Sequence, residues 1–214
     1  TLARSNGIVL KPAEQIAALP QAAPLVATES DLLVPMLLDM LKYSTNLTAE
    51  MTGLSSSLVN GVPVTGLLGS GSRMAGWAME KFGAKGLRFR DHSGLGYGSA
   101  ISPLGMVQIL QPNAGIDVLL KRFKLSIDKK RPAPDGVEVR AKTGTLNFVS
   151  SLAGFVKTKS GRELCFAIFT ADTKRRDAIP PQERERPRGA KGWARRSRTL
   201  QKRLIRDWAA RFDD

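Results

Sequence analysis

The sequence contains very little cysteine or histidine. Its 214 residues include one cysteine, Cys165, and one histidine, His92. A single cysteine excludes an internal disulfide and a cysteine-based zinc site. A single histidine argues against a histidine-rich metal site or a Ser-His-Asp triad. We therefore expect no metal and no cofactor, and chemistry carried by Ser, Thr, Lys, Asn and carboxylates. Because Cys165 lies in an apolar stretch, we expect it to be a small core residue.

Long hydrophobic runs and aromatic residues are also scarce. No run approaches the roughly 20 apolar residues that a membrane-spanning helix needs. Aromatic residues make up 6% of the chain, and no DNA- or RNA-binding signature is present, although proteins that bind single-stranded nucleic acid commonly use aromatic side chains for stacking. The 42% hydrophobic and 24% charged residues are ordinary for a globular protein.

Positive charge is abundant. Lys and Arg number 33 against 19 Asp and Glu, so the net charge is +14 and the pI is about 10.4. Such a balance suits nucleic acid, an acidic membrane surface or an anionic polymer. The C-terminal region is strongly basic: residues 174–211 include 14 Lys and Arg, and residues 172–214 include 7 Asp and Glu. This region therefore supplies about half of the net positive charge of the chain. We interpret this region as the solvated face of a C-terminal helix rather than a nucleic-acid site.

The first two thirds of the chain show helical patterns. Pro35 would be awkward deep inside a helix, so the first one is expected to start near Val34. Two glycines, Gly69 and Gly71, lead into a third helix, and Ser102-Pro103 opens a fourth as a cap followed by a first-turn proline. Residues 86–101 are expected to form a loop. The predicted helices are 30–43, 47–59, 72–82, 102–110 and 115–123.

The last third changes its period to that of strands. Residues 137–142 alternate apolar and polar, 149–156 form a second strand, and 157–162 form a hairpin turn. The nearly all-apolar run 164–170 is typical of a central strand buried on both faces. A helix over 192–212 should then bury a stripe of Trp193, Leu200, Leu204, Trp208 and Phe212. The order predicts an α+β fold with helices on an antiparallel sheet.

Two short motifs match one class of Ser/Lys enzyme. That class carries S-x-x-K, then S-x-N, then K-T-G. Lys142-Thr143-Gly144 ends an alternating strand, where the Lys142 ammonium can face a cleft and Gly144 leaves room for a substrate backbone. Ser44-Thr45-Asn46 lies between two predicted helices. Residues of these types are usually caps there, but the order of the two motifs favours a catalytic interpretation.

Longer blocks around these motifs resemble one family. Four blocks resemble the penicillin-binding D-alanyl-D-alanine carboxypeptidases of the low-molecular-mass class C type: residues 41–50, Asp91-His92-Ser93-Gly94-Leu95, 140–146 and 150–154. The resemblance runs from about residue 25 to residue 170. It implies a serine β-lactamase/penicillin-binding transpeptidase-like fold with a helical subdomain beside a five-stranded antiparallel sheet. It also implies a periplasmic location, peptidoglycan stem peptides ending in D-Ala-D-Ala as substrates, and β-lactams as inhibitors.

The resemblance also implies roles for individual residues. Ser44 would relay a proton towards the leaving group, Asn46 would bind the substrate amide and help place a base lysine, and Lys142 would supply positive charge. Thr143 and Thr145 would hold the substrate carboxylate beside Gly144, and the Thr145 N–H would form half of the oxyanion hole. Asp91, Ser93 and Gly94 are weaker loop candidates. This sequence departs from the family pattern at Gly96-Tyr97-Gly98-Ser99, directly after the loop. We therefore expect His92 to be a solvated loop residue.

The nucleophile motif has no counterpart where the family has it. Only 43 residues precede Ser44, and none of them starts an S-x-x-K. Ser126-Ile127-Asp128-Lys129 has the spacing, but it follows S-x-N and lies in a basic loop. We therefore expect the nucleophile to lie on a segment upstream of Thr1, together with the signal peptide and the first strands of the sheet. This chain alone is then expected to be inactive.

We predict the C-terminal part of a serine-type D-Ala-D-Ala carboxypeptidase with a possible endopeptidase activity. Residues 1–29 would complete an upstream part, 30–136 would form a helical subdomain, and 137–214 would form the K-T-G strand, its neighbours and the last helix. The alternatives are a non-catalytic cell-wall-binding relative, a basic nucleic-acid-binding domain, and a rearranged enzyme that uses Ser126 as its nucleophile.

Overall fold

The computed structural model describes residues 2–12, 14–15, 17–18, 21–23, 26–61, 66–185 and 187–213. The chain divides into two compact units, residues 1–31 and residues 32–214. The first unit contains the short helix α1 (Leu2–Ser5). The second unit contains every other helix and strand, and no helix among the described residues is long and apolar enough to cross a membrane.

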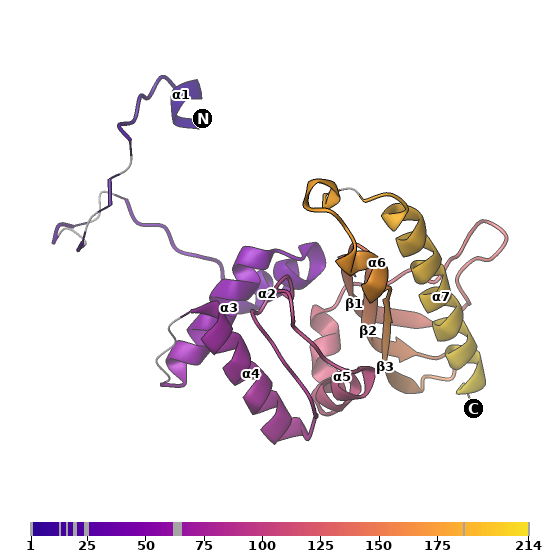
Figure 1. Ribbon diagram of the computed structural model, residues 1–214. Helices are drawn as coiled ribbons and strands as arrows, with labels where there is room; N and C mark the ends of the chain where they lie inside the picture. Colours follow the sequence, from indigo (N-terminus) through magenta and orange to yellow (C-terminus); the bar gives the residue numbers. More distant parts are fainter. Residues whose placement is uncertain are drawn as a thin grey trace. The chain divides into compact units, whose positions relative to one another are not determined.

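The helical half of the second unit begins with α2 (Leu33–Tyr43) and α3 (Asn46–Val59). Pro35 lies in the first turn of α2, where a missing N–H costs nothing, so the helix starts one residue before the expected position. The helices α4 (Leu67–Phe82) and α5 (Pro103–Leu110) follow. Ser102 caps α5 as predicted, since its hydroxyl accepts the Gly105 N–H at 3.0 Å. Figure 1 shows α2, α3 and α4 grouped together.

Two helix predictions were wrong. The helix α4 starts at Leu67 rather than residue 72, so Gly69 and Gly71 lie inside it. Gly71 serves a close approach, because a Cβ there would lie 2.9 Å from the Asp91 nitrogen of the following loop. The predicted helix 115–123 is instead a 3-10 segment, η1 (Gln111–Leu119), and residues 121–123 are extended beside the sheet, where Arg122 bridges Arg140.

The strands form an antiparallel meander, as predicted. They are β1 (Glu138–Leu146), β2 (Val149–Lys157) and β3 (Glu163–Ala171), in the order β1-β2-β3. The turn between β2 and β3 closes through the Thr158 N–H, which donates to the Arg162 carbonyl at 2.8 Å. Within the sheet that the described residues form, β3 is an edge strand and only half-buried, which differs from the expected central strand buried on both faces. Cys165 of β3 is half-buried too, and burial raises the pKa of its thiol to about 11.

The long helix α7 (Ala190–Arg211) lies along one side of the sheet, with α5 on the other side (Figure 1). Between β3 and α7 the chain forms α6 (Thr173–Asp177) and the 3-10 turn η2 (Pro181–Glu183). The core under α7 includes Leu125, Leu152, Val156, Phe166 and Ile205.

The buried stripe of α7 differs from the predicted one. Leu200 and Phe212 are 46% and 40% exposed, whereas the buried residues are Ala190, Ala194, Ser197, Gln201, Ile205 and Ala209. Small side chains let the helix axis approach the sheet closely. The larger Trp193, Leu204 and Trp208 pack at the flanks of this stripe.

Candidate active site

Ser44 and Lys142 lie 98 positions apart in the sequence and meet in the structure. The Lys142 Nζ donates a hydrogen bond to the Ser44 Oγ at 2.5 Å, and another to the Thr143 carbonyl at 3.0 Å. Ser44 comes from the corner between α2 and α3, and Lys142 from β1. The fold therefore joins the S-x-N motif of the helical half to the K-T-G motif of the sheet.

The corner that holds Ser44 has an uncommon backbone. Ser44 ends α2 in the left-handed region, with φ 58° and ψ 50°, and its N–H bonds to the Met40 carbonyl. A residue other than glycine with positive φ is uncommon, and such conformations cluster at active sites. The chain turns here at once into α3, because Thr45 is already its N-cap.

Burial changes the titration of Lys142. It lowers the pKa of the Lys142 ammonium below its ordinary value of 10.5, because removing a cation from water disfavours its charged form. No carboxylate of the described residues forms an ion pair with it. The site thus holds a partly desolvated positive charge against a hydroxyl group. Such a charge can stabilise negative charge that develops nearby.

Asn46 lies two residues beyond Ser44, as the first residue of α3, and is exposed. In the part of the chain that the structure describes, its side chain makes no hydrogen bond to Ser44 or Lys142. The predicted S-x-N pair therefore projects from one corner, and only its serine reaches the lysine.

Thr143, Gly144 and Thr145 form an accessible edge of the sheet. The Ala141 N–H donates to the Lys121 carbonyl at 3.0 Å, and the Phe123 N–H to the Val139 carbonyl at 2.8 Å. Odd-numbered residues of β1 thus direct their backbone polar groups away from β2. Beyond Ala141 the described residues provide no strand on this side, so the backbone of Thr143 and Thr145 faces outward. An extended peptide can add to such an edge.

The neighbouring Ser151 side chain leaves no room for a side chain at Gly144. Its register partner on β2 is Ser151, whose Oγ lies 3.4 Å from the Gly144 carbonyl. A Cβ at Gly144 would sit 2.3 Å from this Oγ. The absence of a side chain therefore serves the packing of β1 on β2 as well as access to the edge.

The predicted loop candidates bond within the helical half. The Asp91 carboxylate accepts the N–H groups of Gly94, at 2.9 Å, and of Gly96. Glu50 accepts the N–H groups of His92 and Ser93 at 3.0 Å each. Burial raises the pKa of Glu50, but the hydrogen bonds from Ser93 and His92 outweigh it and leave that pKa below its ordinary value. Among the described residues, no hydrogen bond or ion pair joins this loop to Lys142, so the loop shapes the half of the molecule that presents Ser44.

The sequence suggested that His92 is a solvated loop residue, and this prediction was wrong. Its Nε2 lies 2.7 Å from the Ser70 Oγ, and Ser70 lies 2.7 Å from the Ser57 Oγ. The ring covers Gly53, where a Cβ would lie 2.1 Å away. Sequence reasoning missed this network because its members come from α3, α4 and the loop, with no motif in common.

Ser126 and Lys129 lie in a non-helical segment, in which the Ile127 N–H donates to the Arg131 carbonyl at 3.0 Å. They are therefore not one helical turn apart, which is how a nucleophile and its base lysine would be arranged. Among the described residues, no three His, Cys, Asp or Glu side chains are grouped closely enough to hold a metal ion.

Two solved structures of other proteins resemble this fold. The structure resembles penicillin-binding protein 4 (dacB) from Haemophilus influenzae in complex with a novel β-lactam, with a TM-score of 0.65 and 20% identity over 96% of this chain and 48% of that one. It also resembles the predatory endopeptidase Bd0816 from Bdellovibrio bacteriovorus, in complex with an immunity protein, with a TM-score of 0.54 and 20% identity over 82% of this chain and 43% of that one.

The chain thus spans about half the length of these structures, and they establish a penicillin-binding, β-lactamase-like fold. No curated protein matches the sequence. The model of the D-Ala-D-Ala carboxypeptidase 3 (S13) family, however, matches residues 3–188, which is most of the chain. This chain therefore belongs to the D-Ala-D-Ala carboxypeptidase 3 (S13) family.

Proposed function

We propose that this chain is the C-terminal portion of a periplasmic serine-type enzyme that acts on peptidoglycan stem peptides, as a D-Ala-D-Ala carboxypeptidase or as an endopeptidase. The Ser44–Lys142 hydrogen bond carries the proposal, because it joins the S-x-N and K-T-G motifs across 98 residues of sequence. The substrates are stem peptides that end in D-Ala-D-Ala, and β-lactams inhibit the enzyme as mimics of that end.

The substrate peptide lies along the outer edge of β1 in this proposal. Its backbone pairs with Thr143 and Thr145, whose N–H and C=O groups face outward, and the hydroxyls of these residues hold the terminal carboxylate. The Thr145 N–H is half of the oxyanion hole. Both threonines are exposed, as contact with a substrate requires.

The reaction divides between a nucleophilic serine and this chain. The serine Oγ gives its proton to the base lysine of its S-x-x-K motif as it attacks the carbonyl of the scissile amide. Ser44 relays this proton from the lysine to the leaving nitrogen, so the C–N bond breaks, the amine leaves and the acyl-enzyme forms. Water then hydrolyses the acyl-enzyme and restores the proton to the serine. The Lys142 ammonium, which donates to the Ser44 Oγ, stabilises the developing negative charge, and Asn46 holds the substrate amide.

We place the nucleophile on a segment that precedes Thr1 in a longer protein. Two observations support this placement. The S-x-x-K at Ser126 is in a non-helical loop and follows S-x-N. In addition, β3 is almost entirely apolar but forms an edge of the three-stranded sheet. Exposed apolar edge strands are prone to aggregation and are usually covered, so a further strand is expected to pair with β3.

Labelling with a fluorescent penicillin tests this proposal. The 214-residue chain and a longer form with an upstream S-x-x-K are treated in parallel, then separated on a denaturing gel and measured by intact mass. We expect label on the upstream segment of the longer form and none on the short chain. Label on the short chain that disappears in Ser126→Ala would overturn the placement and favour the Ser126 enzyme.

Turnover separates an enzyme from a cell-wall-binding relative. The longer form is expected to release D-alanine from a pentapeptide ending in D-Ala-D-Ala. Binding of the pentapeptide without release would instead support the non-catalytic alternative.

A further inference from the structure

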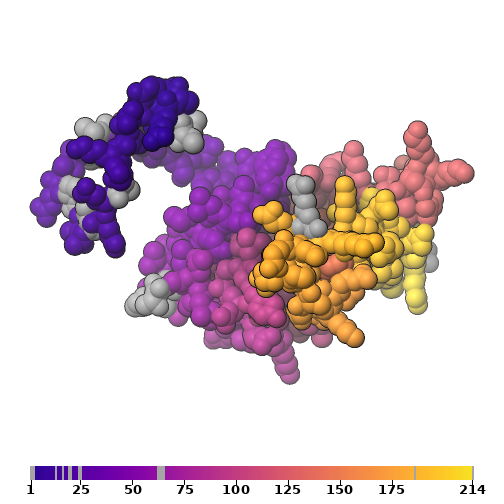
Figure 2. All heavy atoms as spheres, turned by 45° about the horizontal axis from the view of Figure 1, so that its top comes forward, coloured from indigo at the N-terminus to yellow at the C-terminus, as the bar shows by residue number. Residues whose placement is uncertain are grey.

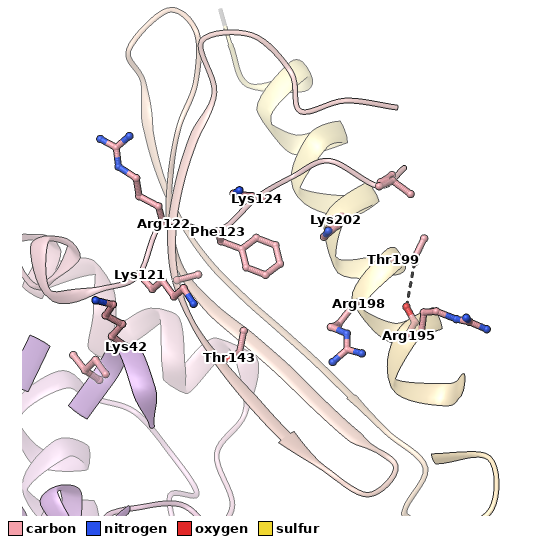
Figure 3. Close-up of a pocket in the computed structure, with 13 residues that line it drawn as sticks. Lys42, Lys121, Arg122, Phe123, Lys124, Thr143, Arg195, Arg198, Thr199 and Lys202 are labelled. Carbon is pink, nitrogen blue, oxygen red and sulfur yellow. Dashed lines mark hydrogen bonds between the residues drawn. The ribbon is translucent and has the colours of Figure 1, made fainter. Parts of the chain in front are cut away.

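A basic cavity lies beside the candidate active site. It has a volume of about 530 Å³ and is bounded by α7, residues 121–127, β1 and the end of α2 (Figure 3). Of the 13 residues that line it, seven are Lys or Arg and none is Asp or Glu. Figure 2 shows the yellow α7 next to the segment around residues 120–135 at the surface. Ser44 and Lys142 do not line this cavity, so it is distinct from the pair that they form.

Six of the seven cations that line the cavity fall into two groups. Lys121, Lys124 and Lys202 lie around the Phe123 ring, and Arg198 extends from the side of α7 that faces β1 (Figure 3). Lys202 Nζ lies 5.9 Å from the centroid of the Phe123 ring and donates to the Ser126 carbonyl at 2.6 Å.

The second group points elsewhere. The guanidinium groups of Arg122 and Arg195 are directed away from the cavity (Figure 3). Arg122 lies 3.8 Å from Glu138. By contrast, Lys121, Lys124 and Arg198 form no ion pair with any residue that the structure describes.

Unpaired like charges around one space favour an anion in it. A cavity of this size matches a small-molecule site, for which about 300–1,000 Å³ is typical. Each carboxylate supplies one negative charge, whereas each phosphate monoester supplies about 1.5 to 2 near neutral pH. Several cations in this volume are therefore neutralised most compactly by phosphates. Arginine adds a planar fork that binds phosphate through two parallel hydrogen bonds.

We propose that this cavity binds a small anion that carries two or more phosphate groups. Lys121, Lys124 and Arg198 contact the phosphates, and the Lys202 ammonium adds a further positive charge to the cavity wall. The apolar wall of Leu41, Phe123 and Ile127 accommodates a carbon skeleton. Because Thr143 also lines the cavity, the bound anion lies next to the β1 edge.

Calorimetric titration of the 214-residue chain with inorganic tripolyphosphate tests the site, at about 0.15 M salt to screen weak surface attraction. The test variant is Lys121→Gln with Arg198→Gln, and the control is Arg122→Gln with Arg195→Gln. Both remove two positive charges from exposed positions in the same two segments. Circular dichroism of each variant confirms its fold.

We expect the test variant to weaken tripolyphosphate binding about tenfold or more, and the control to weaken it less than about threefold, since only the first removes groups that touch the anion. Citrate should bind more weakly than tripolyphosphate to the unmodified chain. Equal losses in both variants would show a response to net charge alone and overturn the site. No binding at all, or citrate binding as tight as tripolyphosphate, would overturn the phosphate assignment.

Discussion

At the scale of single residues, Lys142 has the most informative environment. Its ammonium is partly desolvated, and its hydrogen-bond partner is the neutral Ser44 hydroxyl group. No carboxylate among the described residues pairs with it, so no ion pair offsets the free-energy cost of burying its charge. A lysine in this situation is easier to deprotonate when the chain is folded than when it is unfolded. The stability of the fold should therefore depend on pH through this one group.

The sign of that dependence follows from proton binding. Between the lowered folded pKa and the unfolded value near 10.5, the unfolded chain holds more protons on Lys142 than the folded chain. Stability then rises with pH in this window. We expect the free energy of unfolding of the unmodified chain, relative to Lys142→Met, to increase in urea titrations as the pH rises towards 10.5. A difference that stays constant or falls would contradict a desolvated Lys142.

Gly144 allows a second prediction about a residue pair. Gly144→Ala should lower the free energy of unfolding by about 1–3 kcal/mol, because the added Cβ overpacks against the Ser151 Oγ. Ser151→Ala removes that oxygen, so the double variant should recover most of the loss. Urea titrations of the four proteins form a double-mutant cycle. Additive effects would show that the two residues do not press on each other.

At the scale of elements, α7 shows how a helix is oriented on a sheet. Its largest apolar residues suggest one stripe, but the residues nearest the sheet are mostly small, with Ile205 fully buried among them. Burial of a helix face depends on how closely its axis approaches the neighbouring layer. Alanine and serine permit the closest approach, so the large side chains move to the flanks.

This arrangement predicts unequal costs along one helix. Ile205→Ala should destabilise the protein by about 2–5 kcal/mol, because it leaves a cavity in the core under α7. Leu200→Ala, at a position that is 46% exposed, should change stability by no more than about 0.5 kcal/mol. Thermal or urea unfolding compares the two. A larger loss of stability for Leu200→Ala than for Ile205→Ala would contradict this arrangement and support the buried stripe predicted from the sequence.

At the scale of the whole molecule, the fold brings two sequence-distant motifs together and leaves an open strand edge beside them. The S-x-N corner belongs to the helical half and K-T-G belongs to the sheet (Figure 1). Their contact therefore depends on the docking of one half on the other. If the nucleophile lies upstream as proposed above, a catalytic role for this contact is measured in the longer form of the protein.

In that longer form, Lys142→Met should slow acylation by penicillin about 100- to 1,000-fold, the usual effect of removing one electrostatic stabiliser of an oxyanion. Lys157→Met, at the exposed end of β2, is the matched control and should leave the rate unchanged. Stopped-flow labelling gives both rates. An unchanged rate in Lys142→Met would remove Lys142 from the proposed mechanism.

Much of the local structure could be predicted from the sequence. The alternation in β1, the hairpin turn before β3 and the Ser102 cap of α5 are set by residues near one another in the chain. Local signals failed where distant segments decide the outcome. Gly71 looked like a helix start because its role, to admit the backbone of residues 89–91, is invisible locally.

The α+β order and the two motifs follow from side-chain type and from spacing along the chain, so they can be predicted from the sequence alone. The contact of Ser44 with Lys142, the contact of His92 with Ser70, and the cavity shared by Lys121 and Arg198 depend on the folded structure. These pairs are separated by 22 to 98 residues, and their contact follows from how helices and sheet dock. Docking depends on the summed packing of whole faces, which no short stretch of sequence contains.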